Sequence, residues 1–259
     1  MKKLALVFLA FVLSACSKPS DKTIRIASHT EPMTTVIEIA KKELEDKGYK
    51  VELVLVSDNT AANLALNNKE VDANFFQHVP FMNQFNAANN GTLAGVQPIY
   101  NAKVGFYSKN YKTLSDLPTN ASIAIPNDPV NQARALVMLE KQGMIKLTNP
   151  GPNSKISDIT NTSYEFKEVD LLTLSHAYEE VDLVFNYPTY IKAVGLTPND
   201  ALFLEDDASH YYAISLVARE DNKDSQKIKD LKAAMTNEEV YGFLTNETNS
   251  ITLVPSFKQ

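Results

Sequence analysis

The sequence predicts an α/β protein built from two lobes of similar construction. Apolar alternation typical of a strand is repeatedly followed by apolar residues at helical spacing and then by another strand. This order is typical of parallel strands, because a helix must carry the chain back to the start of the next strand. Residues 70–75 and 180–185 both begin Glu-Val-Asp, end in Phe and lead through a loop and a proline to an expected helix. The likeness is too short to count as a repeat, but it suggests two lobes.

The length agrees with two units. Roughly 240 residues follow the N-terminal segment, which fits one large domain or two lobes of about 100 to 120 residues. We expect one lobe to comprise residues 23–103 and 212–259 and the other to comprise residues 104–211. Each lobe should hold a mostly parallel sheet flanked by helices, with a ligand cleft between the lobes.

The elements of the first lobe follow from periodicity. Ile24 and Ile26 alternate with charged neighbours as in a strand, and apolar residues from Val36 to Leu44 then recur at helical spacing up to Gly48. The remaining expected elements are strands at residues 51–55, 71–74, 96–99 and 104–107 and helices at residues 61–66 and 79–88.

The second lobe repeats this alternation. We expect a helix at residues 188–194 to end at Gly195, a natural residue after a helix C-terminus. Ligands in open α/β sheets bind beyond the carboxyl ends of strands, so the loops after the two similar passages are candidate pocket walls. The other expected elements are strands at residues 122–125, 164–167, 181–185 and 211–218 and helices at residues 129–142, 225–234 and 238–243.

The N-terminal segment predicts export and lipid anchoring. Two lysines precede an apolar run at residues 4–12, which is too short to span a bilayer and is followed by small residues, as in a secretory signal peptide. Residues 13–16, Leu-Ser-Ala-Cys, resemble a bacterial lipobox, so residues 1–15 would be removed. Cys16, the only cysteine, would carry diacylglycerol, with palmitate or a similar acyl chain on the new N-terminus. The alternative is a plain secreted protein with a stray cysteine.

This anchoring places the protein in the bacterial cell envelope, on the periplasmic or extracellular face of a membrane. Residues 16–22 are short and polar and would form a lipidated tether. The net charge of −6 and a pI near 5.3 argue against nucleic acid as a partner.

The sequence shows no catalytic machinery. Lipidation would use up the only cysteine, and the four histidines, at positions 29, 78, 176 and 210, lack the spacing of a zinc site. The chain has eight glycines and no glycine-rich phosphate loop. We therefore expect no enzyme activity, no bound metal and no cofactor.

Residues 125–136 predict a helix start suited to an anion. Asp128 is a good N-cap, and Pro129 falls at the first helical position, where its missing N–H has no consequence. Asn131 and Arg134 then share a helix face, and Arg134 can lean back toward the helix N-terminus. Its planar fork suits a carboxylate. The alternative is a surface arginine paired with an acid such as Glu140.

Two further segments are candidate pocket walls. Residues 74–81 follow an expected strand and carry Phe76, His78 and Phe81, while residues 185–190 have the same layout in the other half with Asn186 and Tyr187. Aromatic rings beside polar tips suit a small ligand with an apolar tail. The alternative is that these rings belong to the hydrophobic core.

Several motifs together resemble the family of methionine-binding lipoproteins, the substrate-binding components of ABC importers. The resemblance runs from the signal peptide to the C-terminal helices. The motifs that carry it are Val71-Asp72-Ala73-Asn74, Phe76-Gln77-His78, Pro80, residues 125–129 with Asn131 and Arg134, residues 195–198 and residues 219–223.

The resemblance implies a two-lobed periplasmic-binding-protein-like fold of type II that encloses an amino acid, with L-methionine favoured. It also implies that Arg134 holds the ligand carboxylate and that Phe76 and His78 line the pocket. An ABC permease and its ATPase would be the partners. Another amino acid, a short peptide, or an adhesive role at the cell surface are the alternatives.

The sequence departs from the family pattern where the ligand's ammonium group is usually bound. The family usually has a tyrosine where Phe81 stands, an aromatic residue near Asn59, and asparagines near Tyr187 and Ile214. Asn186 is a candidate replacement, one residue away. The resemblance therefore supports the carboxylate half of amino-acid recognition more strongly than the ammonium half.

Overall fold

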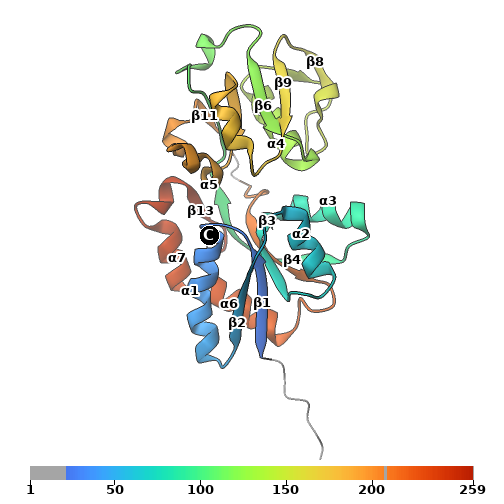
Figure 1. The fold of residues 1–259 in the computed structure, drawn as a ribbon, viewed down its shortest axis with the longest axis vertical. Helices are drawn as coiled ribbons and strands as arrows, with labels where there is room; N and C mark the ends of the chain where they lie inside the picture. Colours follow the sequence, from blue (N-terminus) through green and yellow to red (C-terminus); the bar gives the residue numbers. More distant parts are fainter. Residues whose placement is uncertain (1–21, 207–208, 259) are drawn as a thin grey trace, which may run out of the picture.

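A computed structural model describes residues 22–206 and 209–258 and shows two lobes (Figure 1). The expected signal peptide at residues 1–15 and the lipid site Cys16 lie outside the described residues. In the part of the chain that the structure describes, every helix is too short or too polar to cross a membrane.

The first lobe is built on a six-stranded sheet with the order β13-β4-β12-β3-β1-β2. β1 is parallel to both β2 and β3, whereas β12 is antiparallel to β3 and β4, and β13 is antiparallel to β4. The strands are β1 (Thr23–Ser28), β2 (Lys50–Leu55), β3 (Ala73–His78), β4 (Leu93–Ala102), β12 (Ile214–Arg219) and β13 (Leu253–Pro255).

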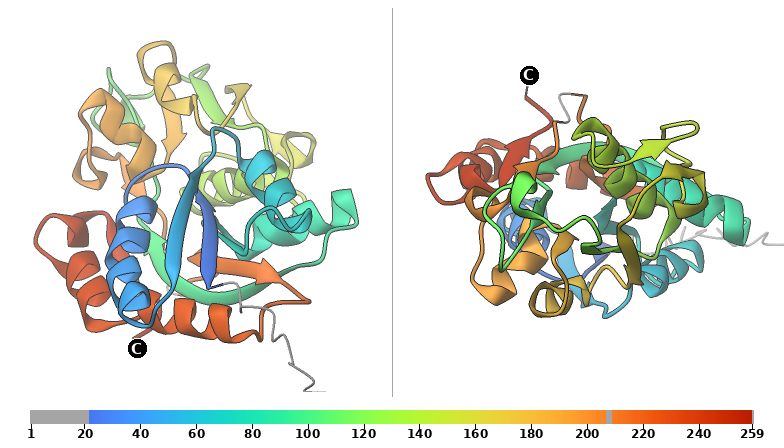
Figure 2. Two further views of the ribbon diagram at one scale, coloured as in Figure 1. Left: turned by 60° about the horizontal axis from the view of Figure 1, so that its bottom comes forward. Right: turned by 90° about the horizontal axis from the view of Figure 1, so that it is seen from above.

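Helices cover both faces of this sheet. Their buried positions recur at helical spacing, as at Val36, Ile37, Ala40 and Leu44. In Figures 1 and 2, α1, α6 and α7 gather on one side of the sheet, and α2 and α3 on the other. The helices of this lobe are α1 (Met33–Asp46), α2 (Asn59–Asn67), α3 (Val79–Asn89), α6 (Gln226–Met235), α7 (Glu238–Thr245) and the 3₁₀ turn η6 (Asn249–Ile251).

The second lobe contains a five-stranded sheet with the order β11-β5-β10-β6-β9. β6 is parallel to β9 and β10, whereas β5 is antiparallel to β10 and β11. The strands of this lobe are β5 (Gly105–Tyr107), β6 (Ser122–Pro126), β9 (Glu165–Val169), β10 (Leu183–Asn186), β11 (Phe203–Leu204) and the separate pair β7 (Lys146–Leu147) and β8 (Ile159–Asn161).

The helices of the second lobe include one long helix and several single turns. The long helix is α4 (Pro129–Lys141), and α5 (Pro188–Ile191) is short. The 3₁₀ turns are η1 (Leu114–Asp116), η2 (Ile156–Asp158), η3 (Leu174–Glu179), η4 (Lys192–Val194) and η5 (Pro198–Asp200).

The sheets are more mixed than the expected mostly parallel sheets, because both chain crossings between the lobes feed antiparallel strands. The first crossing follows Ala102 and leads into β5, and the second follows Leu204 and leads into β12. The long expected helix at residues 188–194 is instead α5 followed by η4, and Gly195 after it has a φ of 79°, as a helix-ending glycine should.

The ends of two strands also differ from those expected from the sequence. β3 continues to His78 instead of ending at Asn74, and β12 begins at Ile214 instead of at residue 211. β7, β8, β11 and β13 were not expected, because strands of two or three residues carry too few positions to show a period.

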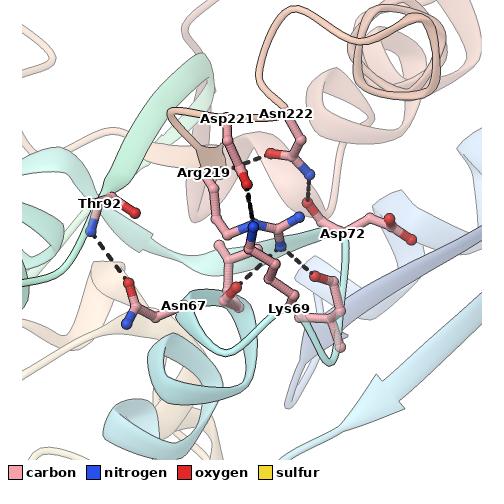
Figure 3. A network of polar contacts seen from close by, with 9 residues as sticks. Asn67, Lys69, Asp72, Thr92, Arg219, Asp221 and Asn222 are labelled. Atoms are coloured by element: carbon pink, nitrogen blue, oxygen red, sulfur yellow. Dashed lines mark hydrogen bonds and ion pairs between the residues drawn. The ribbon is translucent and has the colours of Figure 1, made fainter.

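A buried arginine ties β12 to the turn between α2 and β3 (Figure 3). Arg219, which is 7% exposed, donates from Nη1 to the carbonyl oxygens of Leu66 at 3.0 Å and Val71 at 2.7 Å. Its Nε lies 3.0 Å from Asp221, and Asn222 donates to the carbonyl oxygen of Asp72 at 2.9 Å. These contacts give residues 219–223, one of the motifs that carried the family resemblance, a structural function in the first lobe.

Candidate functional site

A cavity lies between the two lobes, at the carboxyl ends of strands from both sheets. Its walls come from residues that follow β2 and β9, from the end of β3, and from the starts of α4 and α5. This position agrees with the rule that ligands of α/β sheets bind beyond the carboxyl ends of strands. The lining residues are Met33, Asn59, Phe76, Gln77, His78, Phe81, Tyr100, Ala102, Asn131, Leu171, Tyr187, Thr189, Tyr190 and Ile214.

The cavity wall contains five phenylalanine and tyrosine rings, and none of the described residues that line it is an acid, a lysine or an arginine. The rings of Phe76 and Phe81 meet edge to face at 6.3 Å, and Tyr187 and Tyr190 pack against each other at 6.1 Å. The space that a water-sized molecule can occupy is about 30 Å³, which is enough for two or three waters. A larger ligand therefore requires the lobes or the aromatic side chains to move apart.

His78 is held in one tautomer by the start of α3. It caps this helix, and its Nδ1 accepts the N–H of Phe81 at 3.2 Å, so the proton of the neutral ring resides on Nε2. Nε2 lies 3.3 Å from Oδ1 of Asn131 across the lobe boundary. Burial, helped by the positive charge of Arg134, lowers the pKa of His78 to about 3, so the ring is neutral at physiological pH.

Asn131 is fixed by the cap of α4. Asp128 accepts the backbone N–H of Asn131 at 2.9 Å and also binds its side-chain Nδ2. Oδ1 of Asn131 therefore points away from Asp128, and it accepts the hydroxyl of Tyr187 at 2.7 Å. The sequence-predicted helix start thus places an acceptor in the cavity wall.

Arg134 is buried beside the cavity but is not part of its wall. It is 1% exposed, and its Nη1 donates to the hydroxyl of Tyr187 at 2.7 Å. Its Nε donates to Oε1 of Glu205 at 2.7 Å, and its Nη2 binds Oε2 of the same carboxylate. Burial opposes the charge of Arg134, but Tyr187 and Glu205 outweigh it and raise the pKa of the guanidinium above its ordinary value.

This geometry defines the acidic partner of Arg134 and the position of its guanidinium relative to the cavity. The acid paired with it is Glu205, not Glu140, which instead accepts the backbone N–H of Leu147. The guanidinium does not face the gap directly, because the hydroxyl of Tyr187 connects it to the cavity. A series of hydrogen bonds runs from Arg134 through Tyr187 and Asn131 to His78.

Asn59 offers an acceptor to the cavity. It is the first residue of α2, and its buried Oδ1 has no hydrogen-bond partner among the described residues. Asn186 is fully buried, but it does not line the cavity, and its Oδ1 accepts the backbone N–H of Tyr187. The Nδ2 of Asn186 is buried without a hydrogen-bond partner among the described residues, so its contact with the ligand stays a prediction.

Six of the eight sequence-predicted ligand residues lie in the cavity wall, namely Asn59, Phe76, His78, Phe81, Asn131 and Tyr187. Sequence reasoning missed Glu205, because it belongs to none of the motifs or helix starts that pointed to a site. It also missed Met33, Tyr100 and Leu171, whose apolar side chains are indistinguishable from core residues in a single sequence.

Gln77 was expected only as part of a motif. A buried network of amides positions it, since Asn63 donates to its Oε1 at 2.9 Å and its Nε2 donates to Asn74 at 2.9 Å. Within residues 22–206 and 209–258, no three His, Cys, Asp or Glu side chains are grouped so as to hold a metal ion.

The family model described as NlpA lipoprotein matches residues 24–257. The chain belongs to the NlpA lipoprotein family. Among relatives of this NlpA family member, the D-methionine-binding lipoprotein MetQ of Escherichia coli K12 is 36% identical over 213 residues, which cover 80% of this chain and 78% of the relative.

Solved structures of similar proteins share the whole fold of this NlpA family member. A YaeC-family lipoprotein from Enterococcus faecalis is 45% identical with a TM-score of 0.81, covering 92% of this chain and 100% of the other. A periplasmic substrate-binding protein of an ABC transporter from Coxiella burnetii is 32% identical with a TM-score of 0.83, covering 90% and 100%. The chain therefore has the two-lobed periplasmic-binding-protein fold.

Proposed function

We propose that this protein is the substrate-binding lipoprotein of an ABC importer and that it captures an amino acid, with methionine favoured, between its two lobes. The observation that carries the proposal is the cavity at the facing strand ends, which combines aromatic rings with a few convergent polar groups. The names of the MetQ and Coxiella relatives point to the same ligand class and transport role.

The cavity suits the two halves of an apolar amino acid. Phe76, Phe81 and Tyr190 would surround the side chain, and a thioether makes favourable contacts with aromatic rings. Oδ1 of Asn59, which has no hydrogen-bond partner among the described residues, would accept the ammonium group. The carboxylate would reach Arg134 past Tyr187, because the hydroxyl of this tyrosine joins the guanidinium to the cavity wall.

Capture would occur by closure of the lobes. Since the cavity offers only about 30 Å³, the ligand must enter a more open form and then shift the population toward the closed form through contacts with both lobes. His78 from the first lobe and Asn131 from the second already meet at 3.3 Å, which brings the polar walls together.

Lipid anchoring and delivery complete the proposal. A lipid on Cys16 would hold the protein on a bacterial membrane in the cell envelope, and the closed form would dock on a permease driven by its ATPase. Membership in a lipoprotein family and the ABC transporter relative support these two steps.

The test is calorimetry on the lipid-free protein with each amino acid, including both enantiomers of methionine. We expect one tight ligand, with a dissociation constant of about 1 μM or lower, and no turnover of it. Absence of binding to any amino acid would refute the proposal and would favour the adhesive alternative. Conversion of the ligand would instead identify an enzyme.

A further inference from the structure

Glu205 holds the part of Arg134 that an amino-acid carboxylate would use. Its two oxygens meet Nε and Nη2 of Arg134 side by side, the first at 2.7 Å, as in a bidentate arginine–carboxylate pair. The third nitrogen, Nη1, donates to Tyr187. The guanidinium therefore already binds a carboxylate that belongs to the protein itself.

Little of either side chain in the Arg134–Glu205 pair is exposed to water. The side chains of Arg134 and Glu205 are 1% and 8% exposed. The guanidinium carbon also lies 4.1 Å from the centre of the Tyr212 ring, a cation–π contact. An isolated charge on a guanidinium as buried as that of Arg134 would be strongly unfavourable, so Arg134 needs an anionic partner at all times.

Two separate spaces lie next to the Arg134–Glu205 pair. On one side, Tyr187 joins Arg134 to the binding cavity through hydrogen bonds of 2.7 Å on either side of its hydroxyl. On the other side, Arg134 and Glu205 border a hollow of about 210 Å³ together with Lys141 and Asp206. A carboxylate that leaves Arg134 on this side can enter the hollow and regain water, near the ammonium group of Lys141.

We propose that Glu205 competes with the carboxylate of the ligand for Arg134 and thereby sets the affinity of the site. The competition rests on the proposed function, because it requires a ligand with a carboxylate. On binding, the ligand would replace Glu205 at the guanidinium, and Glu205 would turn into the hollow beside Lys141. The measured affinity would be the difference between two arginine–carboxylate pairs, and it would be weaker than an unopposed pair allows.

The decisive variant is Glu205→Gln, which keeps the shape of the side chain and removes its charge. The matched control is Asp206→Asn, which removes the same charge from an exposed residue that borders the same hollow. Calorimetry would use methionine and its carboxamide, which lacks the negative charge. We expect Glu205→Gln to bind methionine about tenfold to a hundredfold more tightly than the wild type, with no gain for the carboxamide and no change in Asp206→Asn.

Each result distinguishes the inference from the proposed function. If the wild type binds methionine and Glu205→Gln binds it equally or more weakly, Glu205 is a permanent partner of Arg134 and the competition is refuted. If neither protein binds any amino acid, the proposed function itself fails, and the competition fails with it. An equal gain for the carboxamide would also refute the competition, because the effect would not depend on the ligand charge.

A measurement on the wild type covers the case in which Glu205→Gln does not fold. With glutamate labelled at the side-chain carboxyl carbon, the resonance of Glu205 can be followed as methionine is added. We expect it to move toward the position of solvent-exposed glutamates at saturation. A resonance that stays unchanged while methionine binds would overturn the exchange.

Discussion

Two buried arginines, Arg134 and Arg219, use the same side chain for different purposes. Arg219 donates to two backbone carbonyl oxygens of its own lobe, those of Leu66 and Val71. Among the described residues, the guanidinium of Arg134 donates to side chains alone, those of Glu205 and Tyr187, next to the gap between the lobes. Arg219 is 7% exposed and Arg134 is 1% exposed, so burial alone does not distinguish the two arginines.

The difference lies in which partners can leave. Backbone carbonyl oxygens in a folded turn cannot move away without unfolding, so Arg219 acts as a fixed tie between β12 and the turn that precedes β3. A carboxylate or a hydroxyl can rotate away, so the partners of Arg134 can be exchanged. A buried arginine whose partners are side chains at a lobe boundary is therefore the better candidate for ligand binding.

The largest expected effect is a loss of stability when Arg219 is replaced. Arg219→Ala should lower the free energy of unfolding by roughly 2 to 4 kcal/mol, because the carbonyl oxygen of Val71 loses its donor and that of Leu66 keeps only the N–H of Lys69. Urea denaturation measures this loss, and Arg25→Ala, which breaks an exposed pair with Glu52, serves as the control. A loss below about 1 kcal/mol for Arg219→Ala would contradict its role as a tie.

The next expected effect is a dependence of stability on pH, which is caused by the buried ring of His78. The unfolded chain protonates His78 below about pH 6.5, whereas the folded protein does so only near its pKa of about 3. The unfolded state therefore binds the extra proton in this window, and the free energy of unfolding should fall by about 1.4 kcal/mol per pH unit as the pH drops from 6.5 toward 3.

Denaturation at several pH values checks this dependence in His78→Gln and in His176→Gln, the exposed control. We expect the slope to decrease by one proton in the first variant only. Equal slopes in both variants would show that His78 is not held neutral by its surroundings.

Arg134, whose side-chain partners can be exchanged, should affect ligand binding. Arg134→Ala should weaken methionine binding by about 2 to 4 kcal/mol, because the ligand carboxylate would be buried without a partner. The single change also leaves Glu205 buried and unpaired, so the double variant Arg134→Ala, Glu205→Ala is measured beside it. Calorimetry that shows near-normal affinity in both would remove Arg134 from the binding site.

The smallest effect concerns an exposed contact between the lobes. Lys192 of the second lobe lies 3.4 Å from Glu31 of the first, with side chains 53% and 69% exposed. Solvent screens such a pair, so Lys192→Ala should change the ligand dissociation constant by less than about fivefold. A larger change would mean that this ion pair, and not the cavity wall, controls closure.

The sequence predicted the parts of this molecule that depend on local patterns. The helical period of Val36 to Leu44 and the cap formed by Asp128 were sufficient to predict α1 and the start of α4. Most of the cavity wall was also predictable, because strand ends and family motifs coincide there. Family membership and the two-lobed fold, expected from these motifs, are confirmed by the family model and the solved structures.

The remaining features depend on contacts between distant residues. Glu205 and Arg134 are separated by 71 positions, and the residues around Glu205 give no local sign that its side chain pairs with a buried arginine. The alternative of a surface arginine was therefore half right, since Arg134 does pair with an acid but does so in the interior. The antiparallel strands β5 and β12 follow from the crossings between lobes, which periodicity does not reveal.

A crystal structure of the lipid-free protein grown with saturating methionine would test most directly whether the lobes enclose the ligand and Arg134 binds its carboxylate. We expect methionine to be enclosed between the lobes, with its side chain against Phe76 and Phe81 and its carboxylate at Arg134 in place of Glu205. A saturated protein in which the space between the lobes stays as small as it is here, with methionine bound elsewhere, would contradict this expectation.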